Sequence, residues 1–262
     1  MPHVVDCEIM AHQEVAAGHY RMALHCPEIA AEALPGQFCM IEVRPGYHPF
    51  LRRPMSVERI FRDGISILYK VEGEGTRLLS GYRTGQSLNV QGPLGKPFPL
   101  PGEGKRPILV GGGIGVAPLP GLAERLMREA GCTPEIVLAA RTDRLLLCSK
   151  DFAQMGCRVT LATDDGSAGM KGFASDALRT LKPGPDTVVY CCGPMPMMRA
   201  VHDVCAELGA LCYASLEALM ACGDGVCMGC VVEANVEIEA ERMVRVCSDG
   251  PVFDSRIINW SA

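Results

Sequence analysis

The sequence predicts a multidomain protein of class β plus α/β. We expect an N-terminal antiparallel β-barrel over 1–100, a central parallel-sheet α/β domain over 101–212 and a small C-terminal domain over 213–262. Three observations lead to this fold class. Short strand-like runs fill the first hundred positions. Strands then alternate with helices, which is typical of a parallel sheet. Cys, Gly and Met dominate the last fifty residues.

The N-terminal part contains five runs with strand character. These are HYRMALHC, GQFCMIEV, RPMSVERI, GISILYKV and QSLNVQG. Gly, Pro and Asp residues lie between them, and such residues favour turns. Short strands at this spacing indicate an antiparallel barrel or sandwich.

The pattern changes at Pro107. The apolar run PILV leads into GGGIG and then into the helical LPGLAERLMREAG, and EIVLAAR, RVTLATDDG and TVVYCCGP follow with helical stretches between them. Alternating strands and helices predict a parallel sheet. The Pro, Gly and charged residues of 101–106 mark the first domain boundary. A second boundary is expected near Tyr213.

Composition excludes several classes of protein. A chain of 262 residues that is 48% hydrophobic exceeds one ordinary domain. Its net charge of -5 comes from interspersed charges, and no Lys/Arg-rich run suits nucleic acid. No apolar stretch reaches the roughly 18 residues of a membrane span. Asp6 and Glu8 lie where a signal peptide would be apolar. We expect a cytoplasmic protein without nucleic-acid or membrane partners.

Four of the fourteen cysteines have the spacing of an iron-sulfur site. The order C-x4-C-x2-C, then sixteen residues and a last cysteine, matches the plant-type [2Fe-2S] pattern. The expected ligands are Cys222, Cys227, Cys230 and Cys247. Gly223, Gly225 and Gly229 would permit close approach and positive φ. The alternatives are a zinc site, whose ligands more often come as paired C-x2-C knuckles, and four unrelated buried cysteines. The other ten cysteines are interpreted as packing residues.

Two further segments carry candidate binding residues, each ambiguous when taken alone. Arg53 and Ser56 begin a strand, and Tyr69 and Lys70 precede GEGT at 73–76. The arginine could equally be a solvated charge, and Tyr69 a half-buried strand aromatic. Glycines at 111, 112, 113 and 115 end a strand and begin a helix, where backbone amides can approach a pyrophosphate. This is not the usual GxGxxG fingerprint, and a packing role is the alternative.

In these segments the chain resembles the ferredoxin-NADP reductase-like flavoproteins, in which an Arg-x-x-Ser strand motif holds FAD against a small barrel. The resemblance implies that Arg53 pairs with the FAD pyrophosphate and Ser56 bonds the isoalloxazine. Met55 stands where many members have an aromatic ring. The implied FAD residues are Arg53, Pro54, Met55, Ser56, Leu68, Tyr69, Lys70, Gly75 and Thr76. The implied NAD residues are Gly111, Gly112, Gly113, Gly115, Cys192, Gly193 and Pro194.

The order of the three parts narrows the resemblance. Across nearly the whole chain, LRRPMS, LYKVEGEGTRLLS, QGPLGKPF, GGGIGVAPL, CCGPMPMM and the cysteine signature resemble the electron-transfer subunits of class B dihydroorotate dehydrogenase. That family implies FAD and a [2Fe-2S] cluster in this chain. It also implies a separate FMN-containing catalytic subunit that oxidises dihydroorotate in pyrimidine biosynthesis, with two of each subunit in a heterotetramer. Electrons would pass from FMN through the cluster and FAD to NAD+.

Several alternatives stay open at this point. A related flavin and iron-sulfur subunit could serve an electron-bifurcating ferredoxin:NADP oxidoreductase or a sulfide dehydrogenase. A non-catalytic redox sensor is a hypothesis of another class. Cys191 and Cys192 could be reactive thiols, although no histidine lies near them in the sequence. Arg141, Thr142 and Arg144 do not decide between NAD and NADP.

Overall fold

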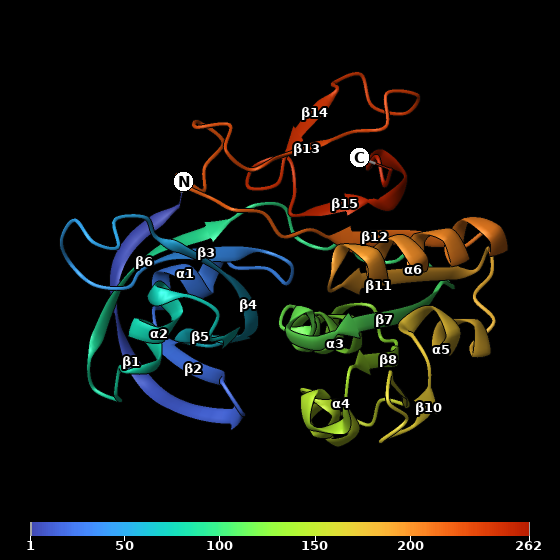
Figure 1. Cartoon of the computed structure of the whole chain (residues 1–262), viewed down its shortest axis with the longest axis horizontal. Helices are drawn as coiled ribbons and strands as arrows, with labels where there is room; N and C mark the ends of the chain where they lie inside the picture. Colours follow the sequence, from blue (N-terminus) through green and yellow to red (C-terminus); the bar gives the residue numbers. More distant parts are fainter. Residues whose placement is uncertain (1, 262) are drawn as a thin grey trace.

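The computed structural model, which describes residues 2–261, contains a closed antiparallel barrel beside a larger sheet flanked by helices (Figure 1). The barrel has the strand order β1-β2-β5-β4-β3-β6. Its strands are β1 (His3–Ala16), β2 (His19–His25), β3 (Phe38–Glu42), β4 (Arg53–Phe61), β5 (Gly64–Lys70) and β6 (Ser87–Leu94). Its helices are α1 (Pro27–Glu32) and α2 (Glu74–Ser80). The five predicted strand runs correspond to β2 through β6.

The larger sheet has the order β10-β9-β8-β7-β11-β12-β15. Its parallel strands are β7 (Arg106–Gly112), β8 (Glu135–Ala140), β9 (Val159–Thr163), β10 (Met170–Lys171), β11 (Thr187–Cys192) and β12 (Leu211–Ser215). The main helices are α3 (Leu119–Glu129), α4 (Ser149–Gln154), α5 (Ala174–Thr180) and α6 (Met195–Leu208), with the 3-10 turns η1 (Gly113–Val116) and η2 (Asp143–Leu145). The predicted barrel and parallel α/β sheet are both confirmed.

Successive residues of β7 pack on opposite faces of this sheet. Ile108 and Val110 lie in a core with residues of α5 and α6, whereas Leu109 packs with residues of α3 and α4. Figure 1 shows α3 and α4 between the sheet and the barrel, and α5 and α6 on the other side. Strands covered on both faces are apolar throughout, which explains the run PILV. No helix within residues 2–261 is long and apolar enough to cross a membrane.

The C-terminal segment joins the larger sheet instead of folding apart from it. Its elements are β13 (Val231–Glu233), β14 (Met243–Arg245), β15 (Val252–Asp254) and η3 (Ser255–Ile257). β15 pairs antiparallel with β12, and β12 itself runs across the expected boundary between residues 212 and 213. Cys230, Cys247 and Ile258 share one buried core with Val110.

An ion-pair network around one buried carboxylate connects the barrel to the α/β part of the chain. Glu58 of β4 is fully buried, and Arg21 of β2 lies 2.6 Å from its carboxylate. Asp151 of α4 lies 3.1 Å from Arg21 and 3.0 Å from Arg59. Ser66 of β5 also donates to Glu58 at 2.9 Å. Arg21 and Arg59 hold β2 and β4 against α4, and Ser66 joins β5 to the same network through Glu58.

Candidate functional site

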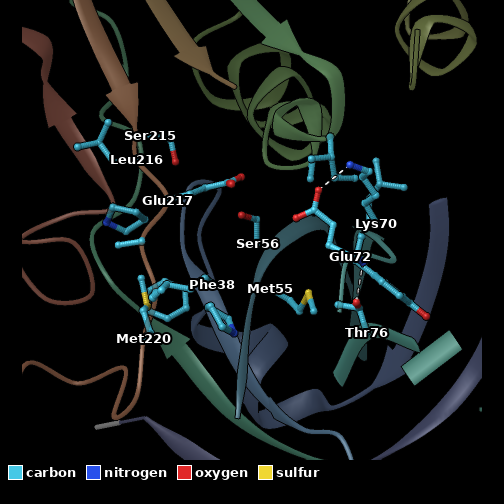
Figure 2. Close-up of a pocket in the computed structure, with 18 residues that line it drawn as sticks. Phe38, Met55, Ser56, Lys70, Glu72, Thr76, Ser215, Leu216, Glu217 and Met220 are labelled. Atoms are coloured by element: carbon cyan, nitrogen blue, oxygen red, sulfur yellow. Dashed lines mark hydrogen bonds and ion pairs between the residues drawn. The ribbon is translucent and has the colours of Figure 1, made fainter. Parts of the chain in front are cut away.

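A cavity of about 410 Å³ lies between the barrel, the turn after β7 and the segment after β12. Its lining includes Pro54, Met55, Ser56, Leu68, Tyr69, Lys70 and Thr76 from the predicted FAD set. Further lining residues lie outside the predicted FAD set: Phe38, Glu72, Ile114, Ala117, Ser215, Leu216, Glu217, Ala218, Leu219, Met220 and Pro251. Figure 2 shows side chains from the barrel facing those of the segment after β12 across this space.

Arg53 and Gly75 belong to the predicted set but do not line the cavity. They lie against one another, because a Cβ added at Gly75 would come within 2.7 Å of Arg53 Cζ. The missing side chain therefore makes room for the guanidinium at the start of α2. Thr76 Oγ1 accepts hydrogen bonds from the backbone N–H groups of Glu72 and Gly73, at 2.9 and 3.1 Å. These bonds fix the turn that carries the cavity wall into α2.

Tyr69 is held in a stack of rings on the barrel side of the cavity. Its ring lies parallel to Tyr20 at 5.7 Å between centroids. His12 Nδ1 donates to the carbonyl of Tyr82 at 2.9 Å, and its Nε2 accepts from the Tyr69 hydroxyl at 2.9 Å. Burial raises the pKa of Tyr69, so the phenol stays protonated. Tyr69 therefore offers a fixed ring surface rather than a titrating group.

Two carboxylates and one cation face the same cavity. Lys70 Nζ lies 2.6 Å from the Glu72 carboxylate, so the two side chains form an ion pair. Glu217 is on the opposite wall (Figure 2). Burial, followed by the charge of Glu72, raises the pKa of Glu217. The cavity thus contains one carboxyl group that is biased toward its neutral form.

The two predicted NAD segments lie next to each other. β7 and β11 are adjacent parallel strands, and Gly111 is in register with Cys192. A Cβ at Gly112 would meet Met197, and one at Gly115 would lie 2.8 Å from the carbonyl carbon of Cys192. Close packing of two backbones therefore requires glycine at 115. Burial raises the pKa of the Cys192 thiol, which disfavours the reactive-thiolate alternative.

Backbone amides point at sulfur throughout the cysteine loop. The N–H groups of Cys227, Gly229 and Cys247 lie 3.4 Å from the sulfurs of Cys222, Cys227 and Cys230 respectively. Gly223 and Gly225 have positive φ as expected. Gly229 does not. Met228 takes the left-handed conformation at φ 59°, which turns the Gly229 N–H toward Cys227.

This donor set suits an anionic sulfur centre. Hydrogen bonds from the backbone at Cys222 and Gly229 lower the pKa of Cys227 to about 7. Burial raises the pKa of Cys247 to about 12, so a thiolate there needs a positive neighbour such as iron. Within residues 2–261 no group of three or more His, Cys, Asp or Glu side chains is arranged to hold a single metal ion. The fit to a cluster rests on the four thiols and the N–H groups directed at three of them.

Two family models match parts of this chain. Residues 217–259 match the iron-sulfur cluster binding domain of dihydroorotate dehydrogenase B. Residues 109–203 match the oxidoreductase NAD-binding domain. The first range contains the four cysteines and Glu217, and the second contains the glycine turn and the Cys192 segment.

Full-length relatives decide the family. A protein from Desulforamulus reducens, named dihydroorotate dehydrogenase B (NAD(+)), electron transfer subunit, is 36% identical over 99% of this chain and 100% of its own length. One of the same name from Lysinibacillus sphaericus is 38% identical over 94% of each chain. The chain belongs to this family. As an electron transfer subunit, it is an oxidoreductase subunit that works with a catalytic dehydrogenase subunit.

Two solved structures have folds similar to that of this chain. An NADH-dependent reduced ferredoxin-NADP oxidoreductase, studied for flavin-based electron bifurcation, has a TM-score of 0.84 and 30% identity, covering 97% of this chain and 90% of the other. A ferredoxin NADP+ reductase from Neisseria gonorrhoeae has a TM-score of 0.70 at 16% identity, covering 81% of this chain and 99% of the other. The second likeness supports the reductase-like fold alone.

Proposed function

We propose that this electron transfer subunit passes electrons from a dehydrogenase partner through a [2Fe-2S] cluster and FAD to NAD+. One observation carries the proposal. Met220 lines the cavity proposed for FAD, and Cys222 begins the cysteine loop two residues later. The two redox sites are therefore joined by one short segment. Electron transfer between centres needs them close together, and this chain connection supports that requirement.

The barrel cavity is the proposed FAD site. Ser56, Lys70 and Thr76 supply its polar groups, while Met55, Leu68 and Tyr69 supply apolar walls. Arg53 beside Gly75 is proposed to pair with the pyrophosphate, since a guanidinium fork matches phosphate oxygens. When bound, FAD accepts electrons singly and releases two as a hydride. The chain's own contribution is to hold the flavin between the cluster segment and the nucleotide-binding turn.

The turn after β7 is the proposed nicotinamide-nucleotide site. Gly111, Gly112, Gly113 and Gly115, together with Cys192, Gly193 and Pro194, would let the cofactor approach the backbone closely. Ile114 and Ala117 from this region line the same cavity as Ser56. A nicotinamide held there would lie next to a flavin in the barrel. The close pairing of β7 with β11 supports treating these residues as one site.

The cluster loop is the proposed contact with the partner. Cys227 is exposed, and the neighbouring Val226 and Met228 are exposed as well. The proposed partner is an FMN-containing dihydroorotate dehydrogenase subunit, in a heterotetramer with two copies of each chain, in the cytoplasm. The names of the relatives support a dihydroorotate-oxidising partner. Fourteen free cysteines suit a compartment that keeps thiols reduced.

We also propose the functional division into 1–100 for FAD, 101–212 for NAD and 213–262 for the cluster. A bifurcating role is the second candidate, because the bifurcating reductase is alike over 97% of this chain. Purification with native partners tests both. The proposal expects FAD, iron and sulfide in this chain, an FMN partner, and NAD+ reduction by dihydroorotate only when both subunits are present. A partner with further iron-sulfur centres and no dihydroorotate activity would contradict it.

A further inference from the structure

Three of the ten cysteines outside the cluster loop lie together on one face of the larger sheet. Cys191 of β11 and Cys212 of β12 are on adjacent strands, with 3.9 Å between their sulfurs. Cys205 of α6 belongs to the same buried core, and its thiol shares a hydrogen bond with Cys212. Two thiols in contact can be oxidised to a disulfide, which is a reaction that a single packed cysteine does not have.

A second cavity, of about 180 Å³, reaches two of these sulfurs. Its lining contains Cys205 and Cys212 but not Cys191. Its rim includes the exposed Ala206 and Arg256, so the cavity opens to solvent. Figure 1 shows this corner, where α6 and β12 lie next to the C-terminal turn. A space of this size admits water or another molecule of a few atoms. A small oxidant can therefore reach Cys205 and Cys212.

The path of the chain brings these two cysteines together. Gly209 follows α6 in the left-handed conformation, at φ 76°. The N–H of Ala210 donates to the carbonyl of Cys205 at 2.9 Å, so the chain reverses directly after the helix. β12 then begins at Leu211 and carries Cys212 back beneath α6. Cys205 lies in the last turn of its helix, where small shifts are tolerated.

Cys191 is less suited to form a disulfide. The register of β11 and β12 places Cys212 beside Val189, so Cys191 is two residues out of line. A bond between Cys191 and Cys212 would require two hydrogen-bonded strands to shift against one another. Cys205 is therefore the better partner for Cys212.

The surroundings of Cys212 favour its thiolate. Hydrogen bonds from Cys191 and Cys205 lower the pKa of Cys212, and Ser255 and the charge of His202 act in the same direction against burial. His202 Nδ1 lies 2.8 Å from Ser255 Oγ, so these two groups are held beside the thiol. The shared hydrogen bond raises the pKa of Cys205. Cys212 is thus the nucleophile of the pair, and Cys205 keeps its proton.

We propose that Cys212 and Cys205 form a dithiol that small hydroperoxides, such as hydrogen peroxide, oxidise to a disulfide. The Cys212 thiolate attacks the peroxide, the O–O bond breaks, and a sulfenic acid and hydroxide form. The Cys205 sulfur then attacks Cys212, an S–S bond forms, and water leaves with the Cys205 proton. Two thiols lose two electrons in all, which the peroxide takes up. This modification site goes beyond the proposed function and requires neither FAD nor the cluster.

The test maps disulfides in the full chain, purified with its cofactors and treated with hydrogen peroxide. Glu207 lies between the two cysteines, so a protease that cleaves after Asp and Glu releases Cys205 in 204–207 and Cys212 in 208–217. After alkylation of free thiols, mass spectrometry should find these two peptides joined, and dithiothreitol should part them. Cys191 should be recovered alkylated. Cys157, whose pKa burial raises, should react at least about tenfold more slowly.

Variants assign the two roles. Cys205→Ser should leave a sulfenic acid on Cys212 that dimedone traps, whereas Cys212→Ser should leave Cys205 reduced. Cys157→Ser, at a buried cysteine on the other face of the sheet, is the matched control and should still form the link. A link between Cys212 and Cys191 would overturn the proposal. So would recovery of both thiols unmodified at a peroxide dose that oxidises the partly exposed Cys132. If the variants do not fold, the wild-type map alone decides between these outcomes.

Discussion

A substitution at Cys227 should test cluster ligation without disturbing the folded core. Its side chain is exposed, so Cys227→Ser should leave the packing unchanged. Loss of one thiolate should remove the cluster, because the iron loses one of four ligands. We expect the cluster's part of the visible absorbance, the iron and the inorganic sulfide to disappear, while the FAD absorbance and its bleaching by NADH remain. Cys132→Ser, at a partly exposed cysteine outside the loop, is the control. Undiminished iron content in Cys227→Ser would argue against the ligand assignment.

Gly115 should tolerate no side chain. A Cβ there would press on the backbone of Cys192 and Gly193, which cannot move aside as a flexible side chain can. Gly115→Ala should therefore cost about 1–3 kcal/mol in the free energy of unfolding, the scale of overpacking. It should also weaken NADH binding while FAD stays bound. Gly102→Ala, where the nearest atom is 3.8 Å away, should change neither value in urea unfolding and NADH titration.

At this scale, local spacing predicted some site residues and missed others. The Arg53 to Ser56 segment and the four cysteines are short motifs whose residues act together, so the sequence displays them directly. Glu217 and Phe38 reach the cavity only because β12 ends and β3 begins beside it. Nothing local distinguishes Phe38 from an ordinary core residue. The charge of Glu217 beside apolar neighbours in SLEALM was the one available signal.

Among the elements, the contact of β2 and β4 with α4 depends on a buried charge. Arg21→Ala would leave fully buried Glu58 without its guanidinium partner and would free Asp151 from it. Removing one partner of a buried ion pair costs about 3–5 kcal/mol. Denaturant unfolding should show a loss on that scale. Arg62→Ala, at a side chain that is 95% exposed, should cost almost nothing. Equal effects of the two changes would contradict a structural role for the network.

Strand prediction succeeded where burial follows a simple pattern. β2 to β6, β7, β8, β9 and β11 have apolar residues on their buried faces, and the sequence shows that pattern. The two-residue β10 and β12 were not predicted. β1 has only Cys7 and Ile9 fully buried among many polar residues, so its pattern is weak. β15 is three residues long and forms only by pairing with β12. Such an edge strand is determined by tertiary contact, which a local pattern does not contain.

At the scale of the whole molecule, the C-terminal segment that carries the four cysteines packs together with the larger sheet. Cys230 and Cys247 share a buried core with Val110, and a Cβ at Gly223 would lie 2.6 Å from Met40 Cγ of the barrel. Composition alone suggested a separate small domain after residue 212, because the segment is irregular. β12 runs across that position and β15 extends the same sheet, so the proposed cluster segment packs on the larger sheet.

Removing the cluster should therefore loosen the sheet as well as the loop. Metal binding to thiolates contributes to folding free energy, and here two of the proposed ligands, Cys230 and Cys247, lie in the core of the sheet. In apo protein made by acid and chelator treatment, amide hydrogen exchange should rise in β12 and β15. Exchange in β2 and β5 should stay unchanged, because these strands lie in the separate barrel core. Identical exchange of β12 and β15 in apo and holo protein would show that the segment folds without support from its metal.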